Sequence, residues 1–508
     1  MTQNEALAIM HSGKSILLTG AAGTGKTYTL SSFIRRSKAL GKNISVTATT
    51  GLAATHLNGT TIHSWAGIGI NDILPKDFFM QIAKQRRDII CKTDILVIDE
   101  ISMMHDFRLD LVDEVCRGVR SSDKPFGGIQ IVLSGDFFQL PPVNRDDSRQ
   151  GSFITASKVW RDGIFTICYL KEQHRQKDDQ QYTDILNGIR SGFLSSRQIA
   201  NLKQRSETVF DPWTTTTRLL TTNIDVDSIN QQHLAELESE SMFYDMTTSG
   251  SKKYVDQLLR SCLAPQTLEL KVGAHVMCIK NSIDKKYVNG SLGVVESFEK
   301  DSHYPVIRLN NNKLITIKPD TWELIDGDRR RASIVQLPLR LAWAITVHKS
   351  QGMTLDSAQI DLSRAFVEGM GYVALSRVKN MKSLKIDGLN RMAFQVSNLA
   401  KQIDADLQLK SDIALTEYAD IIKQWKKTDH TSIPTANMKK SMTWSEKLAL
   451  MRQEFPNAYT PWSEADDRKL VSEFSNGKNI TELSLLLGRH KGSIRSRLNK
   501  HFGEDLFK

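Results

Sequence analysis

Cysteine, proline and long apolar stretches are all scarce in this 508-residue chain, which has only 5 cysteines and 12 prolines. The cysteines form no Cys-x-x-Cys pair, and an odd number scattered this widely argues against a disulfide framework or a zinc site. No apolar run reaches about 18 residues, so no helix is expected to cross a membrane. Residues 1–13 lack the basic and apolar regions of a secretory signal. We therefore expect a protein of the cytoplasm that makes no use of a membrane.

The length, composition and charge further restrict the structural class of the protein and the kind of partner it binds. A chain of 508 residues is expected to form about three domains. Hydrophobic residues make up 40% and charged residues 24%, which excludes collagen-like and wholly disordered classes. The formal net charge is +10, and this favours a polyanionic partner without identifying one.

The order of patterns along the chain predicts an α/β protein with added parts. The first third alternates short β-branched runs with helix-period segments, which is typical of a parallel sheet covered by helices. A second set of buried strands follows after a polar, helical stretch. The predicted parts are a first α/β domain over 1–180 with a short insertion near 66–90, a second α/β domain over 181–250 and 330–395, an inserted small β-barrel over 251–329, a helix and flexible linker over 396–445, and an all-α module over 446–508.

The predicted insertion consists of alternating strands separated by turn residues. Asn289-Gly290, flanked by alternating apolar and polar residues, favours a hairpin. We interpret the segment as a small antiparallel barrel. Surface hairpins with no role of their own remain the alternative.

The C-terminal segment reads as three short helices after a polar linker. Ser463 is placed to cap the first helix, and Gly477 and Gly488 to stop the first and second. This arrangement has the look of a helix-turn-helix, with basic residues on or just before its last helix.

One glycine-rich motif points to nucleotide chemistry. Residues 20–27 satisfy G-x-x-x-x-G-K-[ST], after a predicted strand and at the start of a predicted helix. Glycines let backbone N–H groups curl around phosphates at the positive end of a helix. The residues expected to hold ATP here are Gly20, Ala21, Ala22, Gly23, Thr24, Gly25, Lys26 and Thr27.

Within this motif, Lys26 supplies a point charge for the β- and γ-phosphates, and the Thr27 hydroxyl is expected to bind Mg²⁺. A second metal ligand comes from Asp99, which follows a buried strand at the edge of the sheet where α/β proteins bind ligands. Its neighbour Glu100 faces differently and is our candidate general base for the attacking water.

Seven ordered motifs between about Gln3 and Asn390 together resemble a known family. They are GAAGTGKT, TTGLAATHLNGTTIHSW, DEISM, GDFFQLPPV, EQHRQ, TVHKSQGMTLD and YVALSRVKN. Their order is similar to that of the petite-integration-frequency (Pif-one) helicases, superfamily-one motors that resemble the RecD-like enzymes. The resemblance implies a monomer with two RecA-like domains that clamp ATP and move 5′ to 3′ on single-stranded DNA. It also implies a Src-homology-three-like inserted barrel and a Myb-like C-terminal module.

The same resemblance assigns roles around the nucleotide. Gln139 is expected to contact the γ-phosphate or the attacking water, and Gln3 the adenine edge. Arg175 and Arg377 are the candidate arginines against the developing phosphoryl charge, although relatives more often have an aromatic residue than His174 before the first of them. Gln351 and Gly352 resemble the segment that couples nucleotide state to DNA contacts.

A DNA track is expected on both α/β domains, since single-strand binding combines polar groups with aromatic platforms. Thr61, His63, Ser64 and Trp65 resemble the family's DNA-contacting segment, and a plain core role for His63 and Trp65 stays open. His348 and Lys349 are expected just before a helix that begins near Ser350.

On the C-terminal module, Arg495 and Arg497 are candidate DNA contacts, with protein docking or a purely structural role as alternatives. The sequence thus predicts an ATP- and Mg²⁺-dependent DNA helicase acting on single strands, forks or structured DNA. A DNA-binding ATPase switch that does not unwind is the alternative. A structural DNA-binding protein with a vestigial nucleotide site is disfavoured.

Overall fold

The computed structural model divides the chain into two compact units, Met1–Ser432 and Ile433–Lys508. It describes residues 1–502 except 58, 70–71, 145–148, 211–215, 283–285, 288, 327–328, 428–451, 453–454, 458–459, 461 and 490. Residues 428–445 of the predicted linker, and both ends of the predicted C-terminal module, lie outside this part. No helix in the described part is long and apolar enough to cross a membrane.

The N-terminal lobe is built on a six-stranded parallel sheet in the order β3-β2-β4-β5-β1-β6. Its strands are β1 (Ile16–Gly20), β2 (Ile44–Ala48), β3 (Thr60–Thr61), β4 (Ile95–Asp99), β5 (Gln130–Ser134) and β6 (Thr166–Leu170). The central strands are apolar on both faces and buried, as a sheet covered on both sides requires.

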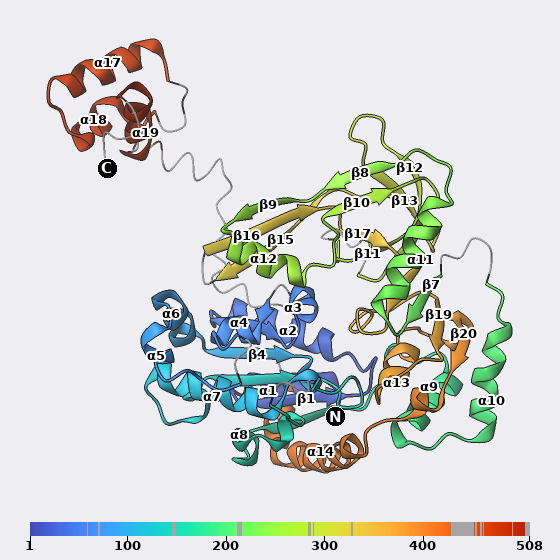
Figure 1. Ribbon diagram of the computed structural model, residues 1–508. Helices are drawn as coiled ribbons and strands as arrows, with labels where there is room; N and C mark the ends of the chain where they lie inside the picture. Colours follow the sequence, from blue (N-terminus) through green and yellow to red (C-terminus); the bar gives the residue numbers. More distant parts are fainter. Residues whose placement is uncertain are drawn as a thin grey trace. The chain divides into compact units, whose positions relative to one another are not determined.

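Helices cover both faces of this sheet, as Figure 1 shows. They are α1 (Gln3–His11), α2 (Lys26–Ala39), α3 (Gly51–His56), α4 (Ile62–Ala66), α5 (Phe78–Gln81), α6 (Lys84–Lys92), α7 (Asp106–Arg120) and α8 (Lys158–Arg161). Helix α5 lies within the stretch near 66–90 that the sequence predicts to be a short insertion, and α6 begins within it and ends just beyond it.

The second lobe has a four-stranded parallel sheet in the order β18-β7-β19-β20. Its strands are β7 (Thr217–Leu220), β18 (Ala344–Thr346), β19 (Ala358–Leu362) and β20 (Leu384–Leu389). The accompanying helices are α9 (Gln180–Ser191), α10 (Ser196–Gln204), α11 (Asn223–Ala235) and α13 (Met370–Leu375). Two parallel sheets within one compact unit agree with the predicted pair of α/β domains.

The inserted region is larger than the predicted 251–329, which corrects the boundaries. Its five-stranded sheet has the order β14-β13-β12-β11-β17, and β15-β16-β9 and β10-β8 form two smaller sheets. The elements are β8 (Met242–Asp245), β9 (Thr247–Gly250), α12 (Lys252–Ser261), β10 (Thr267–Leu270), β11 (His275–Cys278), β12 (Leu292–Phe298), β13 (Pro305–Leu309), β14 (Leu314–Thr316), β15 (Asp320–Asp326), β16 (Arg329–Gln336) and β17 (Leu339–Leu341). Hydrophobic alternation locates a strand but does not choose its partners, and the predicted bounds therefore place β8, β9, β16 and β17 in the second α/β domain although they pair with strands of the insertion.

The predicted Asn289-Gly290 turn lies at the end of a longer connection between the antiparallel strands β11 and β12. Gly290 has a positive φ of 91°, and a Cβ atom there would lie 2.8 Å from the Thr354 carbonyl oxygen of the second lobe. The glycine therefore permits a close approach between the insertion and the lobe that carries it.

Two C-terminal helices of the first unit, α14 (Asn398–Glu417) and α15 (Ala419–Lys427), run back from the second lobe to the first (Figure 1). The Tyr169 N–H of β6 donates to Ser411 Oγ at 3.1 Å, and His11 of α1 stacks on Trp425 with ring centroids 5.0 Å apart. These contacts fasten α14 and α15 to the first lobe.

The second unit contains α17 (Glu464–Ser475), α18 (Ile480–Leu487) and α19 (Lys491–Phe502). Ser463 caps α17 as predicted, because its side chain accepts from the Asp466 N–H. Gly488 ends α18 in the left-handed conformation, and Gly477 follows α17 with a φ of 90°. Leu470, Leu483, Leu487, Ile494 and Leu498 form a small core.

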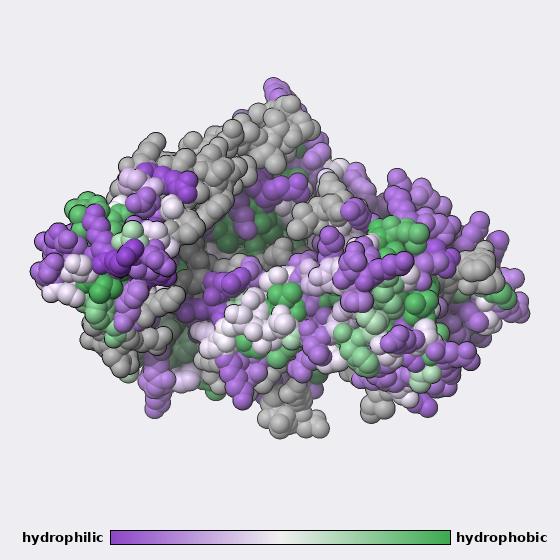
Figure 2. Space-filling model, turned by 90° about the horizontal axis from the view of Figure 1, so that it is seen from above, coloured by the Kyte–Doolittle hydropathy of each residue, from purple (hydrophilic) through white to green (hydrophobic). Residues whose placement is uncertain are grey.

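On the face of the molecule shown in Figure 2, hydrophilic residues predominate and hydrophobic ones gather in small separate groups. This surface agrees with a mean hydropathy of −0.32 and a net charge of +10.

Candidate nucleotide and DNA site

The P-loop connects the buried strand β1 to α2, and its backbone adopts conformations with positive φ that glycine accommodates better than other residues. Gly23 and Gly25 have φ values of 89° and 83°. A Cβ atom at Gly23 would lie 2.3 Å from Gln173 Oε1, and one at Gly25 would lie 2.1 Å from Gln3 Nε2. The loop is thus a cradle that side chains would fill, at the positive end of a 14-residue helix, and it fits phosphate groups.

Lys26 begins α2 and turns back over the loop. Its Nζ donates to the carbonyl oxygens of Gly20 at 2.8 Å and Ala21 at 3.0 Å. Burial lowers the pKa of this lysine, and the carboxylates of Asp136 and Glu100 oppose the effect. A phosphate that binds beside this buried ammonium group would therefore be strongly stabilised by its charge.

Asp99 and Glu100 stand at the carboxyl end of β4, in the same lobe. Burial raises the pKa of Asp99. Glu100 has a left-handed backbone with φ of 53°, a conformation that non-glycine residues adopt at a cost and that often marks a functional site. Asp99 instead ends β4 as part of the strand, so the two neighbouring residues differ in backbone conformation.

The environment of Glu100 suits a base that works near neutral pH. Burial, and then the charge of Asp99, raise the pKa of Glu100 to about 7. Gln351 of the second lobe donates from Nε2 to Glu100 Oε2 at 3.0 Å. The second lobe therefore touches the candidate base directly.

Thr27 lies next to Lys26 in the first turn of α2. A threonine hydroxyl and an aspartate carboxylate are oxygen donors of the kind Mg²⁺ prefers, and Mg²⁺ in nucleotide sites usually keeps waters and phosphate oxygens as its other ligands. The donor set of Thr27 and Asp99 therefore fits a magnesium ion that arrives with a nucleotide.

Gln139 follows β5, with its side chain 6% exposed. Its Nε2 donates to Asp136 Oδ2 at 3.5 Å, while its Oε1 is buried and has no hydrogen-bond partner in the described part of the chain. An unsatisfied buried oxygen carries a free-energy cost that a donor such as water would remove.

Arg175 and Arg377 come together although 202 positions separate them. Arg377 is 2% exposed and donates to the Val373 carbonyl and to Ser376 Oγ, both at 2.7 Å. Arg175 donates to the Ser376 carbonyl at 2.8 Å. Burial, and then the charge of Arg377, lower the pKa of Arg175 to about 9, so the pair would gain from an anion placed between the lobes.

Gln3 is held firmly despite its place near the chain terminus. Thr2 and Glu5 form a capping box around the start of α1, and the terminal ammonium donates to the Tyr169 carbonyl at 2.7 Å. Gln3 Nε2 donates to the Thr24 carbonyl at 3.2 Å. The structure brings Gln3 to the P-loop, as the predicted adenine contact requires.

The predicted DNA residues of the first lobe are not equivalent. Thr61 caps α4 by accepting from the Ser64 N–H at 3.3 Å, and burial lowers the pKa of the partly buried His63 to about 4. Trp65 is only 8% exposed and packs in the main hydrophobic core. A ring buried in this way cannot stack on bases, and this corrects the prediction that Trp65 is a DNA platform.

His348 and Lys349 lie in the second lobe beyond β18, with His348 6.3 Å from the exposed ring of Phe366. The expected helix near Ser350 is absent, because residues 347–352 form consecutive turns that end at Gly352 with φ of 78°. The turns bring Gln351 to Glu100. Burial lowers the pKa values of both His348 and Lys349.

In the C-terminal unit, Arg495 is exposed on α19. Arg497 instead pairs with Asp467 of α17, with Nε 2.7 Å from Oδ1, and lies 5.4 Å from the ring centroid of Trp462. Arg497 would therefore have to leave its ion pair before it could contact a phosphate.

Sequence reasoning missed three residues beside the P-loop: Asp136, Arg190 and Tyr372. The Arg190 guanidinium donates to Asp136 Oδ1 at 2.8 Å, and the Tyr372 hydroxyl accepts from the Ala22 N–H at 2.8 Å. Asp136 and Tyr372 belong to motifs already quoted, GDFFQLPPV and YVALSRVKN, so motif membership was the available signal. Arg190 carried no signal of its own.

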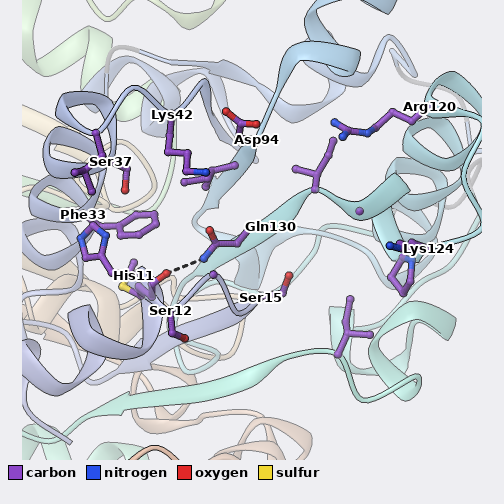
Figure 3. A pocket seen from close by; sticks show the side chains of 18 residues that line it. His11, Ser12, Ser15, Phe33, Ser37, Lys42, Asp94, Arg120, Lys124 and Gln130 are labelled. Carbon is purple, nitrogen blue, oxygen red and sulfur yellow. Dashed lines mark hydrogen bonds between the residues drawn. The ribbon is translucent and has the colours of Figure 1, made fainter. Parts of the chain in front are cut away.

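Two cavities help to locate the site. One of about 740 Å³ lies at the amino ends of β1, β4 and β5, opposite the P-loop, where Gln130 Nε2 donates to the Met10 carbonyl (Figure 3). Another of about 420 Å³ is lined by Ala21 and Thr24 of the P-loop together with residues of α9 and α14. Since α/β sheets bind ligands at the carboxyl ends of their strands, the cavity in Figure 3 is not the nucleotide site.

Comparison with known proteins identifies the family. Models described as "PIF1-like helicase" and "DNA helicase Pif1, 2B domain" match residues 3–199 and 253–298. The ATP-dependent DNA helicase Pif1 of Psychrobacter sp. (strain PRwf-1) is 39% identical, over 85% of this chain and 74% of that protein.

Solved structures agree with this result. Bacteroides sp. Pif1 in complex with ADP-AlF4 is similar with a TM-score of 0.70 and 31% identity, over 81% of this chain and 97% of that one. Bacteroides Pif1 bound to single-stranded DNA has a TM-score of 0.58 and 32% identity, with the same coverage. The fold is that of a RecA-like helicase, and the chain belongs to the Pif1 family of ATP-dependent DNA helicases.

Proposed function

We propose that this protein moves 5′ to 3′ along single-stranded DNA as a monomer and unwinds duplex or structured DNA at the expense of Mg-ATP. The observation that carries the proposal is the second lobe's reach into the P-loop site. Gln351 donates to Glu100, while Arg377 is buried where it acts on the charge of Glu100. Opening or closing of the lobes would therefore alter the candidate base directly.

The residues of the site divide the work between the lobes. When bound, Mg-ATP supplies the phosphoryl group and a metal that neutralises its charge. Lys26 and the P-loop amides hold the phosphates, with Thr27 and Asp99 as the magnesium ligands. Glu100 takes a proton from the attacking water, and Gln139 orients that water through its buried amide oxygen.

Positive charge from both lobes completes the site, since Arg175 belongs to the first lobe and Arg377 to the second. Arg175 and Arg377 stabilise the charge that develops in the transition state, an effect worth about 10³ to 10⁵ in rate in other nucleotide hydrolases. Gln3 contacts the adenine edge. The two arginines can act together only when the lobes approach each other, so hydrolysis is coupled to lobe movement.

We infer the DNA contacts from placement. Thr61, His63 and Ser64 of the first lobe and His348 and Lys349 of the second are the contacts we assign, and Trp65 supports the first group from the core. Single-stranded DNA is bound by the related Bacteroides protein. Because one group lies on each lobe, relative movement of the lobes would shift a bound strand.

Two outer parts are assigned as accessories. The antiparallel sheets of the insertion are proposed to form a Src-homology-three-like barrel beside the DNA, and α17, α18 and α19 a Myb-like helix-turn-helix that contacts DNA through Arg495. The residues assigned above to the nucleotide site come from neither part.

Strand displacement with tailed duplexes tests the proposal. Duplexes with a 5′ or a 3′ single-stranded tail are compared using the full chain, the Lys26→Ala variant and a truncation that ends at Lys427. Displacement of the 5′-tailed duplex alone, lost in Lys26→Ala, is expected. Hydrolysis of ATP stimulated by DNA without displacement of either duplex would instead indicate a regulatory switch.

A further inference from the structure

A buried tyrosine of the second lobe touches the phosphate-binding loop of the first. Tyr372, in α13, is 1% exposed. Its hydroxyl accepts from the Ala22 N–H at 2.8 Å and from Arg190 Nη1 at 3.1 Å, and donates to Asp136 Oδ2 at 3.2 Å. One donated and two accepted hydrogen bonds use the full capacity of a phenol oxygen.

The partners hold this hydroxyl in one position. Arg190 pairs with Asp136 at 2.8 Å on one side and with Asp404 of α14 at 3.1 Å on the other. Its guanidinium also lies 4.1 Å from the centroid of the Phe138 ring. Burial would raise the pKa of Asp136, but the charges of Arg190 and Lys26 outweigh it and lower that pKa. The group is therefore a charged, mutually satisfied network rather than a loose contact.

The loop itself is satisfied internally in this arrangement. The Ala22 N–H is used by Tyr372, and the Lys26 ammonium by the carbonyl oxygens of Gly20 and Ala21. Backbone N–H groups of this loop are the groups that bind phosphate. A charged phosphate oxygen is a stronger acceptor than a neutral phenol, so an incoming phosphate competes with Tyr372 for the same donor.

We propose that Tyr372 is a positioning residue that holds the second lobe on the P-loop through Ala22 and is displaced from Ala22 by a nucleotide phosphate. The inference rests on the nucleotide site proposed above. Tyr372 and Arg377 are five residues apart, the first within α13 and the second just beyond its end. Release of the tyrosine therefore frees the same short segment that carries the candidate arginine.

Removal of the Tyr372 hydroxyl is expected to raise nucleotide affinity. In Tyr372→Phe, the nucleotide-free protein loses the bond to Ala22, whereas the bound protein has already exchanged that bond for one to phosphate. The contact with Asp136 is lost in both states. Because only the free state is penalised, nucleotide affinity rises, by about three- to ten-fold for one hydrogen bond of ordinary strength.

Tyr182→Phe provides a matched control. Tyr182 is also fully buried in the second lobe and donates to the carbonyl oxygen of Leu375 in α13, but its hydroxyl makes no contact with the P-loop. It thus tests the general effect of removing a buried tyrosine hydroxyl from this region.

The experiment is calorimetric titration of the full-length protein, Tyr372→Phe and Tyr182→Phe with ADP in the presence of Mg²⁺ and absence of DNA. We expect Tyr372→Phe to bind ADP three- to ten-fold more tightly than the unaltered protein, and Tyr182→Phe to bind within about two-fold of it. Equal or weaker binding by Tyr372→Phe overturns the proposal. Failure of the unaltered protein to bind ADP would overturn the nucleotide site itself, and this inference with it.

Amide hydrogen exchange in the nucleotide-free proteins gives a second readout that does not need ligand. Exchange in the P-loop is expected to be faster in Tyr372→Phe than in the unaltered protein and unchanged in Tyr182→Phe. Equal P-loop exchange in all three proteins overturns the proposal.

Discussion

Glu100 gives the sharpest prediction, because its folded-state pKa stands well above that of an ordinary glutamate. Burial, followed by the charge of Asp99, raises this pKa from 4.5 to about 7. Between these values the folded protein keeps a proton that the unfolded chain has lost, so the stability of the fold decreases as pH rises through this window. Above pH 7 the full cost, on the order of 3 kcal/mol, is present.

Glu100→Gln removes this cost because the amide carries no charge. We expect the variant to melt at a higher temperature than the unaltered protein at pH 8, by several degrees, and at nearly the same temperature at pH 5. Its ATP hydrolysis should fall by at least about 10²-fold, since the candidate base is lost. Greater stability with lost activity would show that burial of this carboxylate serves function rather than folding.

The assay is thermal unfolding at pH 5 and pH 8 without nucleotide. Glu114→Gln is the control, since Glu114 is exposed on α7 and the same change should leave both melting temperatures within about one degree. An equal shift of Glu100→Gln at the two pH values, or a lower melting temperature at pH 8, would refute the reasoning.

Three further predictions follow from the same geometry. Gln351→Ala removes a hydrogen bond that lowers the pKa of Glu100, so the acidic limb of the pH profile of kcat/KM should move above its position near pH 7, and an unmoved limb would contradict the contact. Trp65→Phe should lower the melting temperature but keep single-strand affinity within about two-fold, as titration with labelled oligonucleotide will show; a ten-fold loss would restore Trp65 to the DNA track. The logarithm of single-strand affinity should fall with the logarithm of salt concentration by about 0.7 per phosphate neutralised, and a flat response would argue against an electrostatic track.

Local features were predictable because they depend on residues close together in the chain. The P-loop between β1 and α2, the acidic pair after β4, and the caps at Ser463 and Gly488 each follow from side-chain size, backbone freedom or capping chemistry over a few positions. The family was predictable for a related reason, since ordered short motifs retain their local chemistry.

Features that depend on distant parts of the chain were missed or misassigned. The contact between Ala22 and Tyr372 joins residues 350 positions apart, and neither motif predicts it. The burial of Trp65 was not predictable for the same reason, because residues from the whole core surround it and not only those of its own segment. The ion pair of Arg497 with Asp467 likewise depends on how two helices pack.

The account depends most on the second lobe's arginine completing a site built by the first, and ATP hydrolysis by Arg377→Lys with saturating single-stranded DNA tests this directly. A lysine keeps the charge but not the guanidinium that binds Val373 and Ser376. The account predicts that DNA-stimulated turnover falls by about 10³-fold or more while ADP affinity stays within a few-fold, and that Arg391→Lys, at an exposed position of the same lobe, behaves like the unaltered protein. Undiminished DNA-stimulated turnover in Arg377→Lys would contradict it.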